Sequence, residues 1–106
     1  MRQAPTGPSL RHRNIAPSHP GELIAMGLEE QGITRTALAR ELGISRNTLY
    51  KLLEGRQGVT AEMAVRLEAV WGSTAQTWLR LQADHDLWDA RRSVDVTRLK
   101  RFHVAA

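Results

Sequence analysis

Apolar residues recur along most of this chain at helical spacing, in five segments separated by capping residues and glycines. Side chains that can accept from free backbone N–H groups predict helix starts at Ser18 or His19, Thr34, Ser45, Thr60, and a capping box of Ser73 with Gln76. Helix ends are predicted at Gly32, Gly43, Gly55, near Gly72 and at about Arg92. Only residues 93–96 alternate with a period of two. The pattern therefore predicts an all-α fold of five helices.

Only three residues, Gly43, Ile44 and Ser45, join the second and third predicted helices. A connection this short favours a steep crossing of the two helices, as in helix-turn-helix units. Gly43 can take the left-handed conformation that ends a helix, Ile44 can fill the core at the bend, and Ser45 can cap the next helix. The apolar face of that next helix has the spacing i, i+3, i+4: Leu49, Leu52 and Leu53.

The polar side of the third predicted helix carries four side chains suited to base edges: Arg46, Asn47, Tyr50 and Lys51. Arginine binds guanine bidentately, asparagine binds adenine, and lysine reaches guanine or a phosphate. In helix-turn-helix proteins the first residues of the second helix contact bases. Neighbouring residues are placed for phosphates: Thr34, Arg35, Thr36 and Arg56. The alternative is a plain helical bundle in which these are ordinary surface residues.

The fifth predicted helix has more apolar surface than one core face requires. Its apolar side chains spread over roughly 260° at 100° per residue, whereas packing on one side of a small domain needs little more than 100°. We therefore expect part of this helix to bury against a second copy of the chain, through Trp78, Leu81, His85 and Trp88. The alternative is that the segment after Arg92 folds back and covers this surface.

Charge alternates in blocks along the 106 residues, with a net charge of +4. Residues 34–58 contain five basic side chains against two acidic ones, and residues 91–106 contain five against one. Such basic blocks suit a polyanionic partner. Three sections are predicted: a flexible basic arm over 1–17, a helix-turn-helix domain over 18–92, and a basic tail over 93–106 whose structure is left open between a short helix, a strand and an extended tail.

The composition excludes several classes of chemistry. The chain has no cysteine, so disulfides, thiolate metal sites and cysteine nucleophiles are excluded. No glycine-rich phosphate loop or nucleophile motif is present, and His85 with Asp89 lacks a third placed metal ligand. We expect neither an enzyme nor a cofactor. No apolar run reaches the length of a membrane span, which predicts a protein of the cytoplasm that is not associated with a membrane.

Four motifs in order give the chain a family resemblance over about residues 15–92: HPGE at the first helix, LAxxLGIS at the turn, the GRxGVT loop, and the late WLxLQxxxDLW. Together they resemble the HigA-type antitoxins, members of the phage-repressor-like (Cro/C1 or XRE) helix-turn-helix proteins. The resemblance implies a five-helix fold like that of lambda repressor, in a bacterial protein associated with the nucleoid. It also implies a homodimer that binds a palindromic operator in double-stranded DNA, represses its own operon, and neutralises a HigB-type (RelE-like) mRNA-cleaving toxin.

By position, the resemblance implies base-facing roles for Arg46, Asn47 and Lys51. It adds phosphate-facing roles for Ser45 and Thr48 to those of Thr36 and Arg56. Many repressors have glutamines where this chain has Arg46 and Asn47, so the operator sequence does not transfer.

Acidic surface is the expected dock for a basic mRNA-cleaving toxin. Glu22, Glu29 and Glu30 on the first helix are one candidate dock. The acidic residues of the fifth helix are the other: Asp84, Asp86 and Asp89. A stand-alone repressor of the same helix-turn-helix class, without a toxin partner, is the alternative function; the late tryptophan-rich motif favours the antitoxin.

Overall fold

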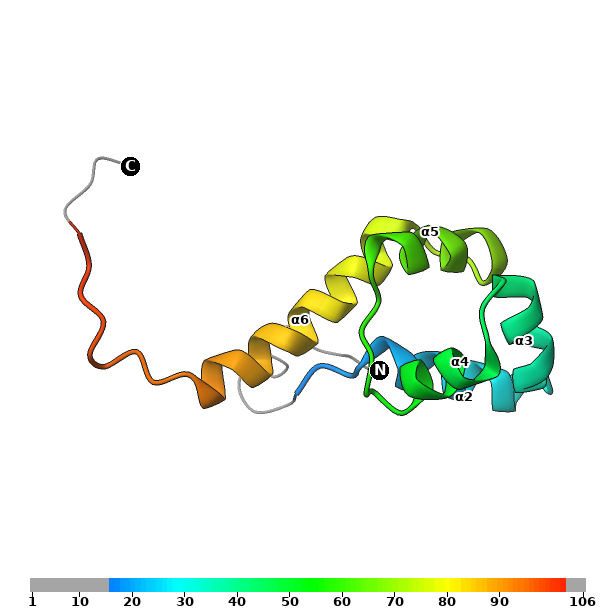
Figure 1. Ribbon diagram of the computed structural model, residues 1–106, viewed down its shortest axis with the longest axis horizontal. Helices are drawn as coiled ribbons and strands as arrows, with labels where there is room; N and C mark the ends of the chain where they lie inside the picture. The colour runs from blue at the N-terminus through cyan, green and yellow to red at the C-terminus, as the bar shows by residue number, and fades with distance from the viewer. Residues whose placement is uncertain (1–15, 103–106) are drawn as a thin grey trace, which may run out of the picture.

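The computed structural model describes residues 16–102. Within that range the chain forms five helices and no strand: α2 (Pro20–Gln31), α3 (Arg35–Leu42), α4 (Arg46–Leu53), α5 (Ala61–Val70) and α6 (Ala75–Ser93). The predicted all-α, five-helix fold is confirmed. In Figure 1, α2 to α5 gather into one body, and α6 runs from that body as a long arm.

Four of the five helices begin at a predicted capping residue. The side chains of His19, Thr34, Ser45 and Thr60 each accept a hydrogen bond from a backbone N–H two or three residues further on, at 2.9–3.2 Å. Left-handed glycines end α2 and α3 as predicted, with φ values of 68° and 73°: Gly32 and Gly43. Local hydrogen bonding therefore determines most of the helix boundaries.

The predicted capping box at Ser73 and Gln76 is wrong by one residue. Ser73 has a positive φ of 63°, because the chain reverses tightly between α5 and α6 and uses both Gly72 and Ser73 to do so. Thr74 takes the extended conformation of a capping residue, and its side-chain oxygen accepts from the backbone N–H of Thr77 at 3.1 Å. The helix starts after the reversal is complete.

The core lies between all five helices. Its largest fully buried apolar side chains come from α2, α3, α4 and α5: Ile24, Leu42, Leu49, Leu52 and Leu67. The long helix α6 contributes Trp78, which is 4% exposed and donates its indole N–H to the Gly72 carbonyl at 2.8 Å. The core thus fixes α4 against α2 and α3, with its other side facing outward.

Residues 94–102, which follow α6, neither form a helix nor return to the body. All of them are exposed, and in Figure 1 they lead away from the end of α6. This region therefore leaves the surface of α6 uncovered. The predicted arm over residues 1–17 lies almost entirely outside the described residues. Within residues 16–102, no helix is both long and apolar enough to cross a membrane.

Candidate nucleic-acid interface

The α3–turn–α4 unit has the geometry that the sequence predicts. The backbone N–H groups of Gly43 and Ile44 donate to the carbonyls of Arg40 and Ala39 at 3.1 and 3.0 Å, which closes the end of α3. Ser45 then caps α4, and its hydroxyl also bonds the Thr48 hydroxyl at 2.9 Å. The turn therefore directs the N-terminus of α4 away from α3.

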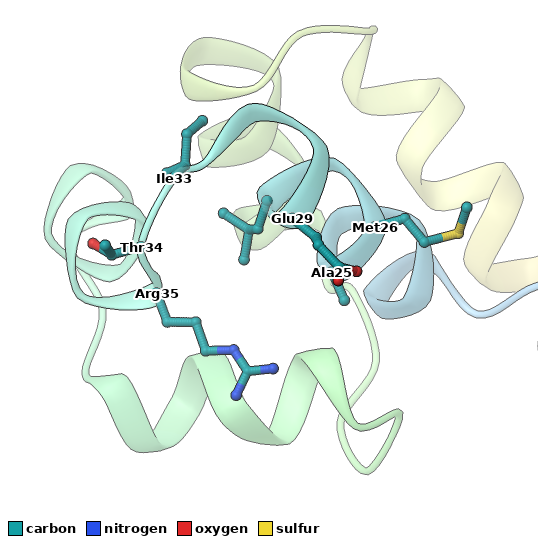
Figure 2. A pocket seen from close by; sticks show the side chains of 7 residues that line it. Ala25, Met26, Glu29, Ile33, Thr34 and Arg35 are labelled. Atoms are coloured by element: carbon teal, nitrogen blue, oxygen red, sulfur yellow. The ribbon is translucent and has the colours of Figure 1, made fainter.

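The four residues predicted to face bases lie on the outer side of α4. Arg46, Asn47 and Tyr50 are exposed and Lys51 is half-buried, whereas the leucines of the helix are in the core. The Arg35 guanidinium lies 5.4 Å from the centre of the Tyr50 ring. Figure 2 shows that this side chain extends from the start of α3 toward α4. A cation–π contact of this kind, worth about 0.5–1 kcal/mol at an exposed site, orients both side chains.

The residues predicted to face phosphates lie at helix N-termini or in the loop after α4. Thr34, Arg35 and Thr36 are exposed at the start of α3, where free N–H groups and the helix dipole favour anions. Ser45 and Thr48 form the equivalent end of α4. Arg56 differs from the others because its guanidinium pairs with Glu54 at 2.8 Å. This pair is 60% exposed on both sides, so it contributes little and can open.

The four residues predicted to contact a second chain do not form one free surface. Trp78 belongs to the core, so the prediction that it anchors a contact between chains is wrong for this side chain. The His85 ring packs edge-on against His19, with ring centroids 4.9 Å apart, so it is engaged within the chain. Leu81 and Trp88 do border an open groove of about 900 Å³ between α6 and the start of α2. The helical spacing identifies the apolar residues of α6, but it does not determine which side of the helix packs on the core.

The predicted acidic dock lies on the outer side of α2. Glu22, Glu29 and Glu30 are all exposed. Glu29 borders a hollow of about 490 Å³ between α2 and α3, whose other edge is Arg35 (Figure 2). The acidic surface of α2 and the basic start of α3 are therefore adjacent.

Two polar residues that the sequence did not single out hold the regions before and after α4. Arg66 on α5 donates to the Leu42 carbonyl at 2.6 Å, at the end of α3. Gln82 on α6 is 8% exposed, and its side-chain oxygen accepts from the Val59 N–H at 2.8 Å. A signal for Gln82 existed, because it lies four residues after Trp78 on the same helix face. No local pattern points to Arg66.

A buried histidine caps α2. The Nδ1 atom of His19 accepts from the Gly21 N–H at 2.9 Å, and the side chain is 5% exposed. Burial lowers the pKa of His19, and so does the neighbouring His85, while Asp86 and Glu22 act in the opposite direction. Protonation of Nδ1 would break the cap and bury a charge. In the described part of the chain, no three histidine or carboxylate side chains cluster as a metal site.

We expect the folded chain to lose stability in mild acid. Because the His19 pKa is lower in the folded than in the unfolded protein, the unfolded state binds more protons below pH 6.5. The stabilisation that the neutral His19 ring provides is therefore fully present above about pH 6.5, and it decreases as the pH falls toward the lowered pKa of His19. Denaturant titrations at pH 7.5 and 5.5 would measure it. His19→Asn keeps a capping side chain without the titrating ring and should show a smaller pH dependence; an unchanged dependence would contradict this assignment.

Comparison with known proteins agrees with this geometry. Residues 24–77 match the helix-turn-helix family. Antitoxin HigA-1 of Vibrio cholerae is 42% identical over 84 residues, which cover 77% of this chain and 78% of that protein. The structure of antitoxin GraA matches with a TM-score of 0.78 at 34% identity, over 84% of this chain and 100% of that one. Pseudomonas aeruginosa antitoxin HigA, solved with the higBA promoter, matches with a TM-score of 0.68 at 36% identity, over 73% and 85%. The chain belongs to the helix-turn-helix proteins and, among them, to the HigA-type antitoxins.

Proposed function

We propose that this chain is a DNA-binding antitoxin that represses its own operon as a homodimer and neutralises a HigB-type toxin. The observation that carries the DNA-binding part is the capped N-terminus of α4, from which Arg46 and Asn47 project into solvent beside the exposed start of α3. The relative from Pseudomonas aeruginosa was solved with promoter DNA, which supports the same use of this surface.

In the proposed complex the N-terminal half of α4 enters the major groove. Arg46 and Asn47 then read base edges, with Tyr50 and Lys51 along the same face. Phosphates on either side would be held by the hydroxyls, free N–H groups and guanidinium groups of Thr34, Arg35, Thr36, Ser45, Thr48 and Arg56. Because these contacts neutralise phosphates, affinity should fall steeply with salt.

A second copy of the chain is the proposed occupant of the groove between α6 and the start of α2. Its border includes Leu23, Leu81, Leu87 and Trp88, and Leu23 and Leu87 are 37% and 49% exposed. A dimer would place two α4 helices to read half-sites one helical turn, about 34 Å, apart. A monomer has too few phosphate contacts for tight binding at physiological salt. Dimerisation therefore supports operator binding.

Leu87→Glu should weaken the dimer and operator binding together. The substitution places a charge where the proposed interface excludes water, which opposes association. Sedimentation equilibrium should show a shift toward monomer, with operator affinity reduced at least tenfold at protein concentrations where the variant is monomeric. Val65→Glu is the matched control, because Val65 is 58% exposed on α5, away from this groove. A variant that remains dimeric would place the interface elsewhere.

The toxin is proposed to dock on the acidic surface of α2. Glu29→Lys with Glu30→Lys reverses two charges there and should weaken toxin binding by about tenfold or more at low salt, measured by calorimetry with the product of the adjacent gene. The reversal Asp89→Lys on α6 tests the other acidic surface. If only this variant weakens binding, the dock lies on α6; Asp84 is left intact because it lines the groove proposed for the second copy, and Asp86 because it bonds Gln82.

Co-purification separates the antitoxin from a stand-alone repressor. The proposal requires a small basic protein, encoded next to this gene, that remains bound through two chromatographic steps. Repression of the promoter without any such partner would support the stand-alone repressor instead.

A further inference from the structure

Arg66 connects α5 to the turn that precedes α4. Its Nη1 atom donates to the Leu42 carbonyl at 2.6 Å and lies 3.4 Å from the Gly43 carbonyl. Its Nη2 atom lies 3.5 Å from a carboxylate oxygen of Glu62, one turn earlier on α5. These contacts hold the guanidinium between α5 and the turn, although the side chain is still 39% exposed. The bonds to Leu42 and Gly43 span more than 20 residues of sequence and join the helix-turn-helix to an element outside it.

The two carbonyls that Arg66 contacts lie where α3 ends. The last carbonyls of a helix have no intrahelical partner and carry the negative end of the helix dipole. The turn itself satisfies the carbonyls of Ala39 and Arg40, which accept from Ile44 and Gly43. Arg66 provides a charged donor for the carbonyls of Leu42 and Gly43, and such bonds are about twice as strong as neutral ones.

These carbonyls belong to the short segment that sets the direction of α4. Only Gly43, Ile44 and Ser45 separate α3 from α4, so a rotation of the Leu42 or Gly43 peptide changes the angle at which α4 leaves. A Cβ atom built on Gly43 would lie 2.8 Å from the Nη1 atom of Arg66, which shows how closely the guanidinium fits the turn. The core leucines of α4 fix how closely this helix packs on the body of the protein. The turn fixes the direction in which its first residues point.

We propose that Arg66 is a positioning residue for DNA recognition: it holds the turn so that Arg46 and Asn47 meet base edges in register. The inference rests on the proposed DNA-binding function. Base-edge hydrogen bonds weaken steeply with misalignment, whereas phosphate contacts tolerate it better. Loss of Arg66 should therefore reduce discrimination between sequences more than it reduces general affinity for DNA.

The test compares the full-length protein with Arg66→Met, Arg66→Gln and Arg66→Lys. Dissociation constants are measured for the duplex upstream of the gene and for a scrambled duplex, each at several salt concentrations, at a temperature where circular dichroism shows every variant folded. In Arg66→Met and Arg66→Gln, the dissociation constant for the scrambled duplex divided by that for the upstream duplex should fall about tenfold. Arg66→Lys keeps one charged donor and should retain part of this discrimination. Arg80→Met, an exposed arginine on α6, is the control for charge.

The salt dependence separates positioning from direct contact. If Arg66 positions α4, the slope of log affinity against log salt stays at the wild-type value in all variants. A slope reduced by about one with an unchanged ratio would mean that Arg66 binds a phosphate itself, and would overturn the proposal. A lower thermal midpoint with an unchanged ratio would also overturn it, because Arg66 would then only stabilise the fold. A wild-type protein without preference for the upstream duplex would refute the proposed function itself.

Discussion

Alanine at Arg46 or at Asn47 is expected to reduce affinity for the operator by about 5- to 150-fold for each substitution, the equivalent of one bidentate base contact of about 1–3 kcal/mol. Both side chains lie at the capped N-terminus of α4 and are exposed, so removing them leaves the leucine core intact. Asn47→Ala removes no charge and should leave binding to scrambled DNA nearly unchanged. Arg46→Ala should weaken binding to the operator and to scrambled DNA, and the loss of affinity should be larger for the operator.

Competition binding at constant salt, with labelled operator and unlabelled scrambled duplex, measures both effects. Arg80→Ala is the matched control, since it removes one exposed arginine from α6 and should change operator affinity by less than about twofold. Wild-type operator affinity in a folded Arg46→Ala, Asn47→Ala double variant would show that α4 is not the helix that reads bases.

Gly21→Ala is expected to destabilise the fold by more than about 2 kcal/mol, or to prevent folding. In this first turn of α2 the backbone passes so close to α4 that a Cβ atom would overlap the carbonyl oxygen of Leu52. Backbone on both sides cannot move aside as a side-chain end can. A loss of stability would indicate the close approach of α2 and α4, because a change of glycine to alanine at an unhindered helix position stabilises a protein by up to about 1 kcal/mol.

Denaturant unfolding measured by circular dichroism tests this, with Gly32→Ala as the comparison. Gly32 has a left-handed φ of 68°, but nothing lies within 4 Å of a Cβ atom there. That substitution should cost only the backbone strain, roughly 1–2 kcal/mol. A Gly21→Ala protein as stable as the wild type would mean that α2 and α4 do not cross this closely.

The helix boundaries were predictable from sequence because they depend on local hydrogen bonds. Thr34, Ser45 and Thr60 each have a backbone N–H three residues on that needs an acceptor, and the structure uses all three. The same rule failed at Ser73, where the reversal between α5 and α6 occupies one residue more than the glycine alone indicated. Capping preferences therefore predict a helix start unless the same residue is needed to form a chain reversal.

The features that the sequence could not supply depend on contacts between distant segments. Helical spacing identifies the apolar residues of α6 but not the side that meets the core, so the pattern predicts a contact surface at Trp78 although this side chain is buried. No sequence pattern separates Arg66 from an ordinary surface arginine, because its bonds depend on how α5 lies beside the turn. The outward residues of α4 were predictable because the leucine spacing fixed its inner face.

Hydroxyl-radical footprinting of the upstream DNA by the full-length protein tests the central claim, that α4 of a dimer reads an operator. Two protected patches are expected on one face of the duplex, centred one helical turn of about 10–10.5 base pairs apart or a multiple of it. Both patches should disappear with the Arg46→Ala, Asn47→Ala double variant and persist with Arg80→Ala. Protection that is uniform along the duplex, or that survives the double variant, would mean that paired α4 helices do not read this DNA.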